Sequence, residues 1–175
     1  MSSVASDVDH LFTPPTGEWV PVSPRLATAR RTVLCAWGAI TAIVWGSLTI
    51  GLGATVAPVL AVIGLVGLVV IVVAVVTGLA LIGRAVRAWG YTLADDIFYI
   101  RRGRIFRKLI AVPYARLQFV DVTAGPVDRW FKLATVQLHT ASAGTDASIP
   151  GLPAERAAEL RDTLTTMSEG RYAGL

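Results

Sequence analysis

The stretch that decides the fold is residues 32–83, TVLCAWGAITAIVWGSLTIGLGATVAPVLAVIGLVGLVVIVVAVVTGLALIG. These 52 consecutive residues contain no Asp, Glu, Lys, Arg or His. One helical crossing of a bilayer takes roughly 20 residues, so the run suits two crossings and a short turn. Gly51, Gly53 and Pro58 interrupt it with residues typical of turns. We therefore expect a transmembrane hairpin over residues 25–88, with helices at about 32–50 and 57–83.

Two alternatives to a transmembrane helical hairpin are disfavoured. A membrane β-barrel needs alternating apolar and polar residues, whereas residues 59–76 are apolar without a break. A helical pair buried inside a soluble domain needs more surrounding chain than the remaining residues supply.

The flanking charges predict how the hairpin is oriented. Arg25, Arg30 and Arg31 precede the run, Arg84 and Arg87 follow it, and residues 51–57 between the helices carry no charge. Because arginine and lysine accumulate on the cytoplasmic side, both termini should be cytoplasmic. The expected location is the plasma membrane, with two passes.

Small residues recur along both helices and allow close helix packing. The simplest use is contact between the two helices of one hairpin, and contact between copies in a homo-oligomer is the second interpretation. The residues assigned to this packing are Gly38, Ala42, Gly46, Gly67, Ala74 and Gly78.

Outside the transmembrane hairpin the residue composition and the apolar pattern change. Residues 1–24 are rich in proline and are predicted to form a flexible tail. Within them, Trp19 and Val20 are candidates for contact with the membrane surface or with the later domain. Short apolar runs at 90–94, 97–101, 104–112, 116–123, 133–140 and 147–150 predict strands, with a two-residue turn at Arg102-Gly103. Pro153 then opens an amphipathic helix. The predicted fold is a small antiparallel barrel or sandwich over residues 89–168 with a C-terminal helix, followed by a tail at 169–175.

Three segments carry a resemblance to a known family. They are the run from Val112 to Val122, the turn Gly125-Pro-Val-Asp-Arg-Trp-Phe, and the strand Leu133-Ala-Thr-Val-Gln-Leu-His-Thr. Together with Pro24-Arg25-Leu26 before the helices, they resemble the YdbS-like bacterial membrane proteins with a pleckstrin-homology-like (PH) domain. That resemblance implies a curved antiparallel barrel capped by the C-terminal helix, and it leaves the ligand open. The matching motif residues are Arg116, Gln118, Gly125, Pro126 and Arg129; Lys132 departs from the pattern, since glycine is common there.

No catalytic or metal-binding set is recognisable in the sequence. The histidines, His10 and His139, lie far apart, and no cysteine or histidine cluster has metal-ligand spacing. No phosphate-binding glycine loop is present. Asp121, Asp128 and Arg129 flank the Gly125-Pro126 turn, where either an ion pair or an interaction surface is expected. The sequence therefore predicts a non-enzymatic protein without a cofactor.

The strongest functional signal is a basic cluster after the hairpin. Residues 84–108 hold seven bases and two acids. Anionic lipids of the inner leaflet attract such clusters, while a purely structural role in solubility and topology explains them equally well. We expect a membrane-anchored adaptor that binds anionic headgroups or a protein partner, and no nucleic acid; the alternative is an accessory subunit contacted through the hairpin. The headgroup candidates are Arg101, Arg102, Arg104, Arg107 and Lys108.

Overall fold

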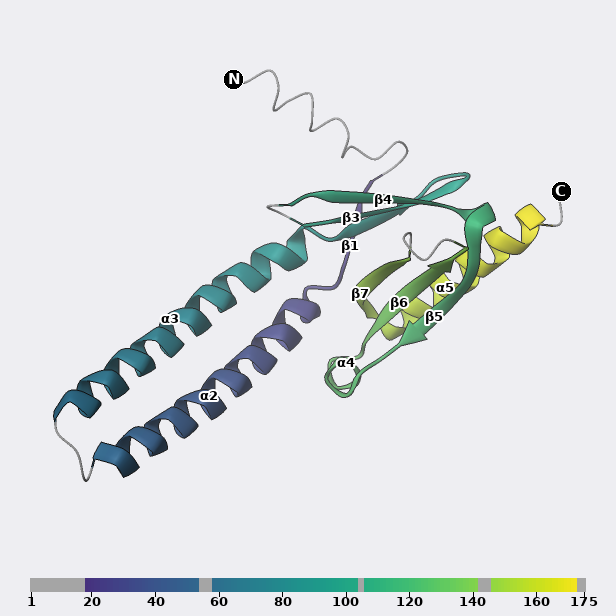
Figure 1. The fold of residues 1–175 in the computed structure, drawn as a ribbon. Helices are drawn as coiled ribbons and strands as arrows, with labels where there is room; N and C mark the ends of the chain where they lie inside the picture. Colours follow the sequence, from purple (N-terminus) through teal and green to yellow (C-terminus); the bar gives the residue numbers. More distant parts are fainter. Residues whose placement is uncertain (1–17, 54–57, 104–105, 142–145, 173–175) are drawn as a thin grey trace, which may run out of the picture. The chain divides into compact units, whose positions relative to one another are not determined.

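The computed structural model describes residues 18–53, 58–103, 106–141 and 146–172. Figure 1 shows two long helices and a β-rich region that carries the C-terminal helix. The chain divides into two compact units. Residues 27–84 form the helical unit, and the described parts of residues 1–26 and 85–175 form the β-rich unit.

The helical unit consists of α2 (Arg25–Gly53) and α3 (Pro58–Arg87), whose ends extend into the β-rich unit. Both helices contain windows apolar enough to cross a membrane, with mean hydropathies of 1.8 and 3.1, and neither window is buried. Each helix is longer than its predicted span. The predicted spans followed the absence of charge, whereas the helical hydrogen bonding continues through the flanking arginines, which are good helix formers.

The two helices pack through glycines that face large side chains. A Cβ atom added to Gly38 would lie 2.6 Å from Val75 Cγ2, and one added to Gly78 would lie 2.7 Å from Leu34 Cδ2. The indole of Trp45 fills the space at Gly67, and its Nε1 donates a hydrogen bond of 3.2 Å to the Gly64 carbonyl oxygen.

Two residues assigned to this packing from the sequence lie beside the contact. Nothing stands within 4 Å of a Cβ added to Gly46, and the side chain of Ala74 is exposed. On α3 the shielded positions advance in steps of three and four residues, so Val75 occupies the contact in place of Ala74; on α2 the side chain of Trp45 fills the contact next to Gly46, which is itself half-buried. Ala42 is half-buried and follows that spacing.

The first sheet of the β-rich unit is antiparallel, with the strand order β1-β2-β3-β4. Its strands are β1 (Val20–Pro21), β2 (Gly90–Leu93), β3 (Ile97–Arg102) and β4 (Lys108–Pro113). The expectation that residues 1–24 are only a tail is therefore wrong for the described part. Val20 pairs with Tyr91, because a short extended segment here satisfies the free edge of β2.

The second sheet has the antiparallel order β5-β6-β7. A short 3₁₀ helix, η2 (Tyr114–Arg116), leads into β5 (Leu117–Thr123), and β6 (Leu133–Thr140) and β7 (Ala147–Pro153) follow. The sequence predicted β6 with its correct bounds and alternation: Ala134, Val136 and Leu138 are buried. It missed η2 and the short helix α4 (Pro126–Trp130), where only a turn was expected.

The C-terminal helix α5 (Ala154–Tyr172) contacts η2 and all three strands of the second sheet. Its buried face carries Ala157, Leu160 and Leu164, while Met167 is more than one-third exposed. The helix continues past residue 168, so the predicted tail at 169–175 is wrong as far as Tyr172. In the part of the chain that the structure describes, the two sheets do not close into a barrel, so the barrel expectation is wrong; the sandwich alternative agrees with two separate sheets.

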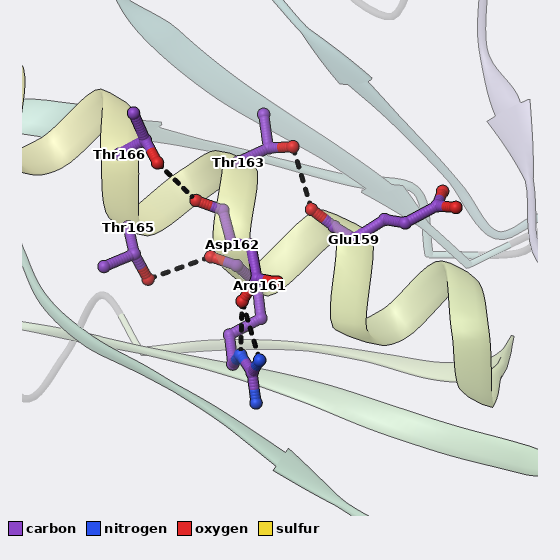
Figure 2. A network of polar contacts seen from close by, with 6 residues as sticks. All are labelled: Glu159, Arg161, Asp162, Thr163, Thr165 and Thr166. Carbon is purple, nitrogen blue, oxygen red and sulfur yellow. Dashed lines mark hydrogen bonds and ion pairs between the residues drawn. The ribbon is translucent and has the colours of Figure 1, made fainter.

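The opposite face of α5 is polar (Figure 2). Three threonine hydroxyls donate hydrogen bonds of 2.8 to 2.9 Å to carbonyl oxygens four residues earlier, from Thr163 to Glu159, Thr165 to Arg161, and Thr166 to Asp162. The guanidinium of Arg161 donates to Asp162 Oδ1 through two nitrogens, at 2.9 and 2.7 Å. These local bonds satisfy polar groups within the helix itself, so this face acts as a solvated surface.

Candidate functional site

The β3–β4 hairpin holds the basic cluster. The strand register pairs Arg101 with Leu109 and Arg102 with Lys108, so residues 103–107 form the connection. The predicted two-residue turn is therefore too short, and the second strand begins at Lys108, later than predicted. Gly103 has a φ of 87°, and a Cβ there would overlap the carbonyl oxygen of Phe106, so this tight turn requires glycine.

The hairpin tip combines exposed charge with an exposed aromatic ring. The side chains of Arg107 and Lys108 are exposed, and Phe106 between the bases is 89% exposed. Arg102 and Lys108 lie directly opposite each other on neighbouring strands, an arrangement that is unfavourable for like charges. An anionic partner would relieve this repulsion. Arg104 lies outside the described residues.

Arg101 has a different role from the rest of the cluster. Its guanidinium lies over the ring of Trp19, 4.9 Å from the ring centroid, and thereby holds the segment before β1. Partial burial lowers the pKa of Arg101, and the nearby charge of Arg107 adds to the effect. Because successive strand residues point to opposite faces, Arg101 and Arg102 do not present one surface. The cluster of five predicted from the sequence is thus divided.

The family-motif residues around α4 form the second feature of interest. Gly125 precedes the helix and Pro126 is its first residue. The backbone N–H of Gly125 donates a hydrogen bond of 3.3 Å to Asp128 Oδ2, and the Arg129 N–H donates to the Gly125 carbonyl at 2.9 Å. Within the described residues Asp128 therefore fixes the turn through the backbone, without the ion pair to Arg129 that was one expectation.

The other motif residues lie at the opposite end of β5. Arg116 ends η2, and its carbonyl accepts a hydrogen bond of 3.3 Å from the Ala141 N–H. Gln118 lies at the register shift between Leu117 and Phe119, where an extra residue bends the strand. Both side chains are exposed. The structure therefore does not bring Arg116 and Gln118 together with Gly125, Pro126 and Arg129.

A histidine cluster on the second sheet was not foreseen from the sequence. The rings of Phe119 and His139 stack, with centroids 4.3 Å apart and planes inclined by 16°. His139 lies between two carboxylates, with Nδ1 3.4 Å from Asp146 Oδ2 and Nε2 3.7 Å from Asp121 Oδ2. The pairing of β5 with β6 creates this neighbourhood, and only that register could have revealed it. Among the residues that the structure describes, no group of three or more His, Cys, Asp or Glu side chains has metal-binding geometry.

Comparisons with known proteins agree with this architecture. Residues 31–168 match the family described as "Bacterial PH domain". Over 82 residues the chain is 34% identical to the UPF0699 transmembrane protein YdbS of Bacillus subtilis (strain 168), an alignment that covers 47% of this chain and 50% of that relative. No solved structure matches.

These findings confirm the resemblance on which the PH-like fold was predicted. The chain spans about half the length of the curated relative it matches. Its two exposed apolar helices and its transmembrane relative identify it as a membrane protein. The family match extends from within α2 through α3 and strands β2 to β7 to most of α5, and β1 precedes it. The chain belongs to the bacterial PH domain family.

Proposed function

We propose that this protein is a non-enzymatic, membrane-anchored PH-like module whose β3–β4 hairpin binds anionic lipid headgroups at the inner leaflet. The single observation that carries the proposal is the hairpin tip, where Phe106 is 89% exposed between Arg102 and the bases Arg107 and Lys108. An aromatic side chain suits the membrane interface, and each nearby base contributes on the order of 1 kcal/mol toward an anionic leaflet.

The anchoring helices make weak contacts sufficient. With two passes and both termini in the cytoplasm, the β3–β4 hairpin is tethered next to the inner leaflet at a high effective concentration. Contacts that would be negligible for a free protein then determine how the β-rich unit is oriented. Because surface charges are screened at high salt, the orientation should depend on ionic strength.

The test uses the full chain in lipid nanodiscs, because β1 and Trp19 precede the membrane helices and would be lost from a fragment that begins after them. In a Cys35→Ala background, which removes the single cysteine, Phe106→Cys is labelled with an environment-sensitive dye. We expect a blue shift in discs that contain phosphatidylglycerol relative to discs of pure phosphatidylcholine, and a smaller difference at high salt.

The matched variants separate the hairpin from net charge. Changing Arg102, Arg107 and Lys108 to Gln should remove the difference between the two lipids. Changing Arg116, Arg156 and Arg161 to Gln, which removes the same charge elsewhere on the β-rich unit, should leave it. Equal spectra in neutral and anionic discs would refute the lipid proposal.

A protein partner is the second candidate for this module. Trp130 on α4 is 87% exposed and Val127 beside it is 38% exposed, and exposed aromatic residues are common anchors of protein interfaces. Purification in mild detergent that retains a stoichiometric partner, lost in Trp130→Ala and kept in the hairpin variant, would favour this role over lipid binding. Loss of the partner only when the membrane helices are exchanged for unrelated ones would favour an accessory subunit that is contacted through the transmembrane hairpin.

A further inference from the structure

A basic cavity lies in the β-rich unit where α4 and β6 meet the start of α5. Its volume is about 350 Å³. Three cationic side chains, Arg25, Arg129 and Lys132, line it together with one carboxylate, Glu155. The cavity is separate from the β3–β4 hairpin, since none of its lining residues belongs to β3 or β4.

Two distant parts of the sequence bring these cations together, the start of α2 and the residues of α4 and the turn that follows it. Ser23 donates a backbone hydrogen bond of 3.0 Å to the Gly151 carbonyl, and its hydroxyl accepts one of 3.3 Å from the Arg25 N–H. This places Arg25 beside the end of β7. Arg129 comes from α4, the short helix between β5 and β6. The position of each cation is therefore set by backbone hydrogen bonds.

Lys132 is held in an unusual backbone conformation. Its φ is 55°, the only positive φ of a residue other than glycine in the described part of the chain. Its N–H donates to the Arg129 carbonyl at 3.1 Å, and its carbonyl accepts from the Ala154 N–H at 3.2 Å. Lys132 thus links the end of α4 to the start of α5. Glycine adopts this conformation without strain, so lysine here adds a charge at an energetic cost, and such costs concentrate at functional sites.

The charges of the cavity are not neutralised internally. Within the described residues no carboxylate oxygen lies within 4.0 Å of the charged nitrogens of Arg25, Arg129 or Lys132. Three positive charges against one negative leave a local excess that attracts an anion. Two guanidinium groups offer paired donors that match the oxygens of a phosphate group better than those of a monovalent halide.

We propose that this cavity binds a phosphate group. The group belongs either to a lipid headgroup or to a soluble phosphate compound. Arg25 lies seven residues before the charge-free run, so even a fully extended chain would place it at most about 25 Å from residue 32. Both sources therefore have access to the cavity.

The experiment measures the thermal unfolding of the β-rich unit in the full chain, in phosphatidylcholine nanodiscs at constant ionic strength. One arm titrates inorganic phosphate, with chloride as the reference ion. The other arm replaces part of the phosphatidylcholine by phosphatidic acid. Both arms are carried out with the hairpin variant Arg102→Gln/Arg107→Gln/Lys108→Gln, so that failure of the hairpin to bind lipid does not affect the result.

We expect a saturable rise of the unfolding midpoint with at least one of the two probes. Arg129→Gln and Arg25→Gln should each weaken the apparent affinity about tenfold, as expected for the loss of one charged hydrogen bond. Arg161→Gln, on the polar face of α5, should not change it. A response to inorganic phosphate alone assigns a soluble compound, a response to phosphatidic acid alone assigns a lipid headgroup, and a response to both supports a phosphate site that takes either source.

The variant Lys132→Gly separates phosphate binding by Lys132 from a purely structural role of this residue. It relieves the backbone strain, so the unfolding midpoint without phosphate should be no lower than that of the parent. The rise of the unfolding midpoint that the phosphate probe produces should nevertheless be smaller than in the parent. No response to either probe, or the same response in the parent and in Arg129→Gln, would overturn the proposal.

Discussion

The side chain of Leu26 lies directly over Gly151, so closely that a Cβ atom added to Gly151 would come within 2.6 Å of the Leu26 Cβ and Cδ2 atoms. Leu26 is 4% exposed, and the Ser23 N–H bonds the Gly151 carbonyl one turn earlier in the chain. The segment that enters the first helix is thereby fixed to β7. This contact explains why the Pro24-Arg25-Leu26 motif is part of the β-rich unit and also why Arg25 reaches the basic cavity.

The Leu26–Gly151 contact predicts a large effect of one added methyl group. Gly151→Ala should destabilise the β-rich unit by about 2–4 kcal/mol, because it combines a strained φ of 73° with the overlap on Leu26. Urea unfolding of the full chain in detergent, followed by near-ultraviolet circular dichroism, measures it. Gly170→Ala is the control: nothing lies within 4 Å of its added Cβ, and in a helix it should gain up to about 1 kcal/mol. Equal losses in the two variants would contradict the proposed contact.

The closing helix α5 should be sensitive on one face only. Leu164 is 0% exposed, so Leu164→Ala should cost about 2–5 kcal/mol. Leu160→Asp should cost at least a few kcal/mol, because it buries an unpaired charge. Thr165→Ala, on the polar face in Figure 2, should change the free energy of unfolding by less than about 0.5 kcal/mol. A comparable loss for Thr165→Ala would mean that the helix does not pack as described.

Tyr114 should make the stability of the β-rich unit fall at high pH. Burial, with a smaller contribution from the Asp95 carboxylate, raises the pKa of the Tyr114 hydroxyl from 10.0 to about 12. Its hydroxyl donates a hydrogen bond of 3.0 Å to the Ala94 carbonyl. Because the neutral form is favoured in the folded state, this stabilisation is complete below pH 10 and is lost as the pH rises through about 12.

The measurement for Tyr114 compares the parent with Tyr114→Phe. The phenylalanine variant should be less stable at neutral pH, because it leaves the Ala94 carbonyl without this donor, and the difference should narrow between pH 10 and pH 12. Unfolding midpoints over that range test it. A constant difference between the two proteins would show that Tyr114 ionises equally in both states.

Substitutions of different glycines in the helical unit should have different effects on its stability. Gly38→Val and Gly78→Val introduce side chains where Val75 and Leu34 already occupy the space, so each should lower the thermal stability of the hairpin in detergent. Gly46→Val is the matched control, since its added Cβ meets nothing within 4 Å. Loss of stability at Gly46 but not at Gly38 would point to contact between copies of the chain instead.

The positions of the arginines predict the topology. A reporter enzyme that is active only outside the cytoplasm, fused after Leu175, should be inactive, because bases flank both ends of the hairpin while residues 51–57 carry no charge. The same reporter inserted between the two helices should be active. Activity at Leu175 would mean that both termini lie outside the cytoplasm, so that the β3–β4 hairpin could not reach the inner leaflet.

The sequence by itself determined the features that depend on local pattern. Fifty-two uncharged residues require two helices, and the alternation around Val136 requires a half-buried strand, since each follows from the period of apolar residues. The motif around Gly125 and Arg129 identified the family. These signals lie within short segments, so no knowledge of distant contacts was needed.

Only the tertiary structure decided which distant residues meet. The pairing of Val20 with Tyr91 turned an expected tail into a strand, and the register of β3 with β4 placed Arg102 opposite Lys108. The meeting of Arg25 with Arg129 and Lys132, and the packing of Leu26 on Gly151, bring together residues more than a hundred positions apart, and the Ser23–Gly151 backbone hydrogen bond joins the two segments. Such contacts follow from how the sheets and α5 share one core, because a side chain's neighbours across a core have no trace in the periodicity of its own segment.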